Sequence, residues 1–161
     1  VNLPAKDKKT PARYQHLAKD NITVVPLADD AGHARIIAGR FGNTDGAAET
    51  FTELNVWDIV LNSGAGADLD VPASHNLMLV VLRGEVRING GQSVQASQMA
   101  TFERESGSVK VEAVGGEAKI LLLSGVPIDE PVVGYGPFVM NTEAEIAEVM
   151  NEFRSGKFGA V

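Results

Sequence analysis

The chain contains no cysteine, and this absence excludes several kinds of chemistry at once. Without a thiol there is no disulfide, no thiolate zinc site and no cysteine nucleophile. The sequence also lacks any apolar run approaching the roughly 18 residues that cross a bilayer. Its start has no apolar stretch of the signal-peptide type. These absences fit a reducing compartment, so we expect a cytoplasmic chain with no membrane partner.

Basic residues are also scarce. Lys and Arg number 14 against 21 Asp and Glu, which gives a formal net charge of −7. The basic cluster Lys6, Lys8, Lys9 and Arg13 lies in a proline-containing segment typical of a solvated linker. Because a chain of this charge repels a phosphate backbone, we expect no direct binding of nucleic acid.

The three histidines, His16, His33 and His75, are scattered singly along the chain. A metal site on a strand needs ligands at i and i+2, so that both point to one side of the sheet. His75 heads a predicted strand and could be a ligand or a base, but a histidine in this position is more often a hydrogen-bonded structural residue. We therefore predict no catalytic, cofactor-binding or metal-binding residue in this chain.

Other residues with chemical potential are predicted to be surface features. The segments "GRFGNTDG" and "NSGAGAD" are Gly-rich but do not connect a strand to a helix, so we expect loops rather than phosphate cradles. Asp58 is predicted to point to solvent, on the strand face opposite Trp57. Glu103 and Glu105 would share one face of a strand, where an acid/base pair is conceivable but a rim of surface charge is expected.

With 161 residues, 44% of them hydrophobic and 22% charged, the chain is long enough for one packed domain or two small ones, and one globular unit is the default. Short β-type runs, separated by Gly, Asn, Asp and Ser, predict an antiparallel sandwich or barrel. The runs cover residues 22–28, 34–41, 55–61, 75–82, 85–88, 99–103, 109–114 and 118–125. The Asn-Gly-Gly of "EVRINGGQSVQ" predicts a tight hairpin.

Two of these runs are apolar on both faces. In "HNLMLVVL" and in "KILLLSG" apolar side chains occupy odd and even positions alike, whereas "SVKVEAV" alternates apolar with charged residues. A strand that is apolar on both faces needs cover on both sides. That cover is either the other sheet of a sandwich or a second domain docked outside.

One α-helix is predicted near the end of the chain. Thr142 and Glu145 have the spacing of a capping box, and Gly156 is placed to end the helix. The apolar residues at i, i+3, i+4 and i+7 form one stripe, made of Ile146, Val149, Met150 and Phe153. The connector "DEPVVGYGPF" before it is predicted to be extended, with a bend at its glycines.

Together these segments resemble a known family. "VNLPAKDKKTPARYQHL", "LNVWDIVL", "LRGEVRINGG", "LLLSGVPIDEPVVGYGPFVMNTEAEI" and "FRSGKFG" closely resemble the second half of pirins, which are bicupin proteins about twice as long. The resemblance implies an all-β fold: a cupin-like antiparallel β-barrel or double-stranded sandwich with one C-terminal α-helix. It also implies that an N-terminal cupin is missing from this chain.

In pirins the iron site, three His and one Glu, belongs to the N-terminal cupin. Some members are reported as quercetin 2,3-dioxygenases, and eukaryotic members act as nuclear transcription co-regulators. In this chain the general cupin pattern places Leu77 at the acid position, residues 70–73 at the His-x-His positions and Phe102 at the last ligand position. The resemblance therefore implies that this cupin binds no metal and that iron sits in the missing half.

From these observations we expect a linker over residues 1–21, a cupin barrel over 22–127, and an arm with a helix over 128–161 that packs on the N-terminal half. The residues expected to contact that half are Tyr135, Phe138, Met140, Ile146, Val149, Met150 and Phe153. The expected function is structural support for the iron-binding cupin. The alternatives are part of an iron-dependent quercetin 2,3-dioxygenase, or an interaction or transcription co-regulator module.

Two further expectations concern binding. Copies of this chain could pair as a homo-oligomer through the surface meant for the missing half. A small apolar ligand could lie inside the barrel near Trp57 and Phe102, although the interior of a small barrel is more often filled by its own side chains.

Overall fold

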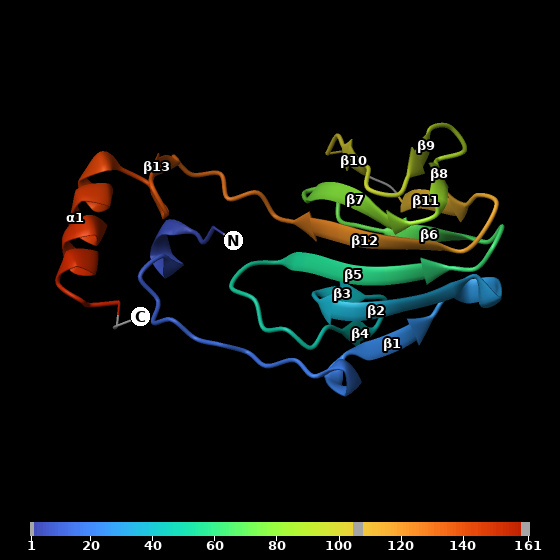
Figure 1. Ribbon diagram of the computed structural model, residues 1–161, viewed down its shortest axis with the longest axis horizontal. Coiled ribbons are helices and arrows are strands. Elements are labelled where there is room, and N and C mark those ends of the chain that lie inside the picture. The colour runs from blue at the N-terminus through green and yellow to red at the C-terminus, as the bar shows by residue number, and fades with distance from the viewer. Residues whose placement is uncertain (1, 105–107, 159–161) are drawn as a thin grey trace. The chain divides into compact units, whose positions relative to one another are not determined.

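The computed structural model of the chain describes residues 2–104 and 108–158 (Figure 1). The chain divides into two compact units. The β unit is Tyr14–Pro127, and the terminal unit combines Val1–Arg13 with Ile128–Val161. Within the described residues, no helix has the length and apolar character needed to cross a membrane.

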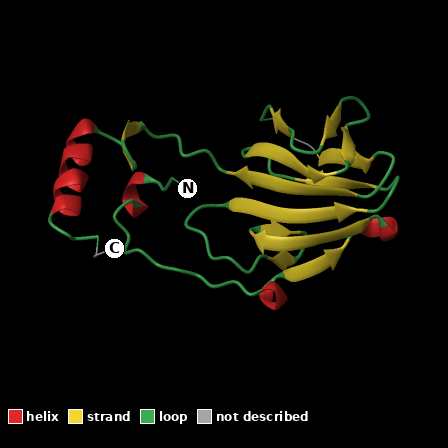
Figure 2. Cartoon of the chain, in the orientation of Figure 1, coloured by secondary structure: helices red, strands yellow, loops and turns green. Residues whose placement is uncertain are grey.

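The β unit is built mainly from two antiparallel sheets, coloured as strands in Figure 2. The larger sheet has six strands in the order β1-β2-β5-β12-β7-β10. Their bounds are Thr23–Pro26 for β1, Gly32–Ala38 for β2, Leu54–Leu61 for β5, Ala118–Gly125 for β12, Asn76–Arg83 for β7 and Met99–Phe102 for β10. Some strands that are neighbours in this sheet, such as β5 and β12, are distant in the sequence. The sheet therefore depends on long-range pairing.

The smaller sheet has four strands in the order β6-β11-β8-β9. Their bounds are Gly66–Asp70 for β6, Ser108–Ala113 for β11, Glu85–Ile88 for β8 and Ser93–Gln95 for β9. The remaining elements of the unit are the short strands β3 (Arg40–Phe41) and β4 (Thr44–Asp45) and the 3₁₀ turns η2 (Lys19–Asn21) and η3 (Ala28–Asp30). Because the two sheets are separate, the fold is an open sandwich rather than a closed barrel.

The core lies between the two sheets. Trp57 is opposite Ile36 on one side and Leu122 on the other, and Leu122 is opposite Leu79, so these side chains form one inward row across the large sheet. All four are almost completely buried. The small sheet contributes buried residues such as Val111 to the same cluster. Burial of this kind, at roughly 25 cal/mol per Å² of apolar area, is the main force that holds the sheets together.

The predicted all-β architecture with one α-helix is confirmed, and a strand forms in each predicted run. The hairpin at Asn-Gly-Gly is confirmed as well: β8 pairs with β9, and Asn89 and Gly90 have the positive φ angles that such a turn requires. Two predicted loops are wrong in part. The first contains β3 and β4, and the second leads directly into β6, because pairing with β11 overrides the weak strand propensity of its glycines.

The outward side of the large sheet carries a continuous apolar surface, which we call the outer apolar face. Leu123 is opposite Met78, and Leu121 is opposite Val80, which is opposite Met99 on the edge strand. The outer apolar face consists of Met78, Val80, Leu82, Met99, Leu121 and Leu123. Leu82 and Met99 expose 49% and 56% of their surface. The sandwich therefore covers only one face of the doubly apolar strands.

The prediction that Asp58 points to solvent is wrong. Asp58 does lie on the face opposite Trp57, but it is buried. Its Oδ2 atom is 3.1 Å from Lys119 Nζ and 3.4 Å from Arg35 Nη1, on the two neighbouring strands. Long basic side chains lie over the carboxylate because their aliphatic stems cover apolar surface while their charges pair with it.

The terminal unit joins the first residues to the last. It contains η1 (Ala5–Asp7), a hairpin of β13 (Val133–Tyr135) with β14 (Phe138–Met140), and helix α1 (Glu143–Arg154). The amide of Ala5 donates to Glu130 Oε2 at 2.7 Å, and Lys9 Nζ lies 2.6 Å from Glu148 Oε1. Residues 2–13 thus pack within this unit, and the expected division into a linker over residues 1–21, a barrel and an arm stays a prediction.

Helix α1 begins with the predicted capping box, in which Thr142 accepts from the Glu145 amide and the Glu145 carboxylate accepts from the Thr142 amide. Much of its apolar stripe is covered inside the terminal unit. Ile146 and Val149 are buried with Met140, and Phe138 and Met150 pack against them. Tyr135 and Phe153 remain exposed by 61% and 57%. Contact of the seven predicted residues with another half of the protein stays a prediction.

Candidate functional site

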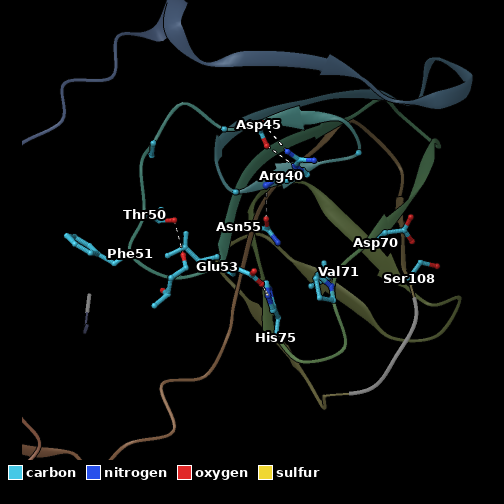
Figure 3. Close-up of a pocket in the computed structure, with 17 residues that line it drawn as sticks. Arg40, Asp45, Thr50, Phe51, Glu53, Asn55, Asp70, Val71, His75 and Ser108 are labelled. Carbon is cyan, nitrogen blue, oxygen red and sulfur yellow. Dashed lines mark hydrogen bonds and ion pairs between the residues drawn. The ribbon is translucent and has the colours of Figure 1, made fainter. Parts of the chain in front are cut away.

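The β unit has a pocket of about 1040 Å³ at one end of the sandwich (Figure 3). Strand β5 begins at this end and β12 ends there, because the two strands are antiparallel. Strand β7 also begins there, directly after His75. Asn55, Ser124 and Leu77 therefore meet in one inward row. The row through Trp57 is entirely apolar, whereas in this row Asn55 and Ser124 are polar and Leu77 is apolar.

A chain of hydrogen bonds runs through the polar part of this row. The amide of Arg40 donates to Asn55 Oδ1 at 3.0 Å, and Asn55 Nδ2 donates to Ser124 Oγ at 3.0 Å. Ser124 Oγ lies 3.3 Å from His75 Nδ1. Asn55, Ser124 and His75 are all buried. The other ring nitrogen, His75 Nε2, is buried and has no hydrogen-bond partner among residues 2–104 and 108–158, although a buried polar atom normally has one.

Local sequence explains how these groups are held. Gly39 has a φ of +79°, and a Cβ atom at this position would lie 2.1 Å from Asn55 Oδ1. Only glycine allows the backbone to approach Asn55 so closely and to donate to it from Arg40. On the other side, the amide of His75 donates to the carbonyl of Pro72, so a tight turn sets the ring at the start of β7.

The rim of the pocket is charged. Glu53 Oε2 is 3.9 Å from His75 Nε2, and Figure 3 shows the Glu53 carboxylate beside the His75 ring. Arg40 makes a two-pronged contact with Asp45, at 2.8 Å and 3.1 Å. Asp70, at the end of β6, also lines the pocket. With Arg40 already paired, the carboxylates of Glu53 and Asp70 give the recess an acidic character.

The residues at the cupin ligand positions do not fit a metal ion. Leu77 and Phe102 are direct partners across β7 and β10, so the fold does bring these two positions together. Both are hydrocarbon side chains that pack with the core cluster, as does Val71. Asp70 is exposed at the rim. Among residues 2–104 and 108–158, no group of three or more His, Cys, Asp or Glu is arranged to hold a metal.

The structure disperses the other candidates from the sequence. His16 is exposed, His33 lies on the outward face of β2 and Glu103 is exposed, while Glu105 lies outside the described residues. Trp57 is fully buried, with its ring edge-to-face to Phe41 at 5.0 Å, and a ligand near Trp57 and Phe102 stays a prediction. His75 makes a structural hydrogen bond with Ser124 through Nδ1, and its Nε2 atom has no hydrogen-bond partner among the described residues.

Asn55, Ser124 and Glu53 were missed from the sequence. A signal was present for two of them. Asn55 shares a strand face with Trp57 and Ile59, and Ser124 shares one with Ile120 and Leu122, so both are polar residues at inward positions. Glu53 precedes its strand and has no such signal.

Comparison with known proteins bears on the ancestry of this site. The family described as the pirin C-terminal cupin domain matches residues 56–159. A provisionally named quercetin 2,3-dioxygenase of Pseudomonas aeruginosa is 43% identical over 98% of this chain and 54% of that protein. A pirin-like protein of Caulobacter vibrioides is 34% identical over 98% of this chain and 56% of its own length.

A solved structure has the same fold. The crystal structure of a quercetin 2,3-dioxygenase from Acinetobacter baumannii superposes with a TM-score of 0.91 at 42% identity, covering 99% of this chain and 55% of that one. The chain thus spans about half the length of the curated relatives it matches. On this evidence the chain belongs to the pirin C-terminal cupin domain family.

Proposed function

We propose that this chain is a cupin domain that binds no metal itself and gives structural support to an iron-binding cupin domain of the same protein. The observation that carries the proposal is the pairing of Leu77 with Phe102, because the cupin pattern puts two metal ligands at these positions. Iron in proteins is bound by nitrogen, oxygen or sulfur atoms, which neither side chain carries.

The outer apolar face supports the second part of the proposal. Leu82 and Met99 are large apolar residues left about half exposed at one side of a central sheet. Exposed apolar surface of this kind marks contacts with other proteins or domains. The curated relatives are nearly twice as long as this chain, so the remaining part of such a protein is the partner that fits this face best.

Metal analysis of the purified chain tests the proposal. The chain is expressed with ample iron, purified without chelators, and its iron, nickel, copper, manganese and zinc are measured per chain. We expect every metal to be far below one atom per chain, and added ferrous iron to leave the unfolding temperature unchanged. One tightly held metal atom per chain would overturn the proposal.

A second function, for the whole protein, is favoured by the names of the relatives. Two proteins more than 40% identical to this chain carry the name quercetin 2,3-dioxygenase. We propose that the full-length protein is an iron-dependent dioxygenase in which this chain supports the active domain. Oxygen uptake with quercetin should require the full-length protein loaded with iron and be absent from this chain alone. Uptake by this chain alone would contradict that division of roles.

A further inference from the structure

We propose that the pocket at His75 binds a neutral molecule with an apolar body and one hydroxyl group, which accepts a hydrogen bond from His75 Nε2 and donates one to Glu53. The inference does not depend on the proposed function, because neither His75 nor Glu53 is at a cupin ligand position. The pocket is nevertheless lined in part by Asp70, Val71 and Pro72, which fall within the His-x-His positions 70–73.

The first step fixes the proton on the His75 ring. A backbone amide can only donate, so the Arg40 amide orients Asn55 with Oδ1 toward it and Nδ2 toward Ser124. Ser124 Oγ therefore accepts from Asn55. Within the described part of the chain, the only other partner of Ser124 Oγ is His75 Nδ1, which then accepts the hydroxyl proton. A neutral His75 carries its proton on Nε2, so Nε2 is an unused, buried donor.

The second step concerns the gap between His75 and Glu53. At 3.9 Å, His75 Nε2 and Glu53 Oε2 are too far apart for a direct hydrogen bond. An oxygen atom beside this gap can lie about 2.8 Å from both atoms. A hydroxyl oxygen suits this place, since it accepts from Nε2–H and donates its own proton to the carboxylate. An ether or a carboxylate could accept from His75 but could not donate to Glu53.

The third step is charge and shape. The cation Arg40 is already paired with Asp45, so Glu53 and Asp70 make the pocket unfavourable for an anion. The walls beside the polar groups include the apolar residues Leu54, Val71 and Pro72. Charge thus disfavours carboxylates and phosphate esters, and the walls favour an apolar body, for which a benzene ring is a small probe.

The experiment compares three probes built on one benzene ring, phenol, anisole and benzoate, on the 161-residue chain. Binding is followed by the ¹H–¹⁵N correlations of the histidine rings, with the His75→Phe variant used to assign His75. We expect the free chain to show the Nε2–H tautomer at His75, and phenol to shift that resonance at millimolar concentration. Anisole and benzoate should bind at least about tenfold more weakly, the factor carried by one hydrogen bond to a charged group.

The Glu53→Gln variant makes the test independent of folding, because Glu53 is highly exposed and its replacement leaves the core intact. An amide can donate to benzoate, so the preference for phenol over benzoate should shrink by about tenfold. The matched control is Glu85→Gln on β8, which does not line the pocket and should leave all three affinities unchanged. The proposal fails if His75 carries the Nδ1–H tautomer, if phenol does not shift His75, or if the three probes bind equally.

Discussion

Ser124 is a polar residue at an inward position of β12, on the same face as the apolar residues Ile120 and Leu122. Its hydroxyl joins Asn55, on β5, to His75, in the turn before β7. In a buried site each of these partners would be costly to leave without a hydrogen bond. The residue thus couples the packing of the large sheet to the orientation of the His75 ring.

The Ser124→Ala variant tests this coupling. Removal of the hydroxyl leaves Asn55 Nδ2 and His75 Nδ1 without this partner, and the free energy of unfolding should fall by about 1–3 kcal/mol. Urea unfolding followed by Trp57 fluorescence measures the change. Ser93→Ala, on the exposed side of β9, is the control and should change stability little. Equal stability of the two variants would mean that the hydroxyl has no structural role.

At the scale of elements, helix α1 depends on carboxylates at both of its ends. The Thr142 hydroxyl, with the backbone amides of Asn141 and Thr142, holds the pKa of Glu145 below its ordinary value of 4.5. Lys157, and then Lys9, lower the pKa of Glu152 in the same way. A carboxyl group whose pKa is lowered by folding stabilises the folded form above its unfolded pKa, and this stabilisation is lost as the pH falls through the folded value.

We therefore expect α1 to become less stable as the pH falls below about 4.5, the ordinary pKa of both carboxyl groups, while β5 and β12 keep their protection. The measurement is hydrogen exchange of the α1 amides, compared with the amides of β5 and β12. In the Thr142→Ala variant the helix should be less stable at pH 7 by about 1 kcal/mol, the usual worth of an N-cap. Its dependence on pH should also be smaller. Parallel loss of protection in α1 and the β unit would contradict this prediction.

Features set by neighbouring residues could be predicted from the sequence, whereas features set by residues from distant strands could not. The capping box of Thr142 and Glu145 and the hairpin at Asn89 are set by neighbouring residues, and both were predicted. The burial of Asp58 depends on Arg35 and Lys119 from other strands, which no local pattern reveals. The pocket likewise requires the register of β5, β12 and β7, so its residues could be suspected as polar outliers but not grouped.

At the scale of the whole molecule, the outer apolar face predicts a partner. The double variant Leu82→Glu, Met99→Glu should weaken binding of this chain to the iron-binding cupin domain that we propose as its partner by about tenfold or more, since unpaired charges are costly to bury. Calorimetry with the two domains expressed separately measures the affinity. Both residues are exposed, so the variant should fold normally in this chain alone.

Val24→Glu is the matched control. Val24 is also exposed and is opposite Arg35, on the outward side of the same sheet, but it lies on β1, at the edge farthest from β10. In the row across the sheet that contains Val24, Arg35 and Asp58 lie between it and Leu121 of the outer apolar face. The affinity of this control for the proposed partner domain should be unchanged. Similar losses in the control and the double variant would show that charge in general, and not this face, governs association.

The terminal unit is held together by contacts between residues 2–13 and residues 128–158. Lys8 and Lys9 hold the hairpin and the helix from the opposite end of the sequence, through Val139 and Glu148. Removal of residues 2–13 should therefore loosen α1. A truncation at the start of the sequence thus also removes contacts of the hairpin and the helix near its end.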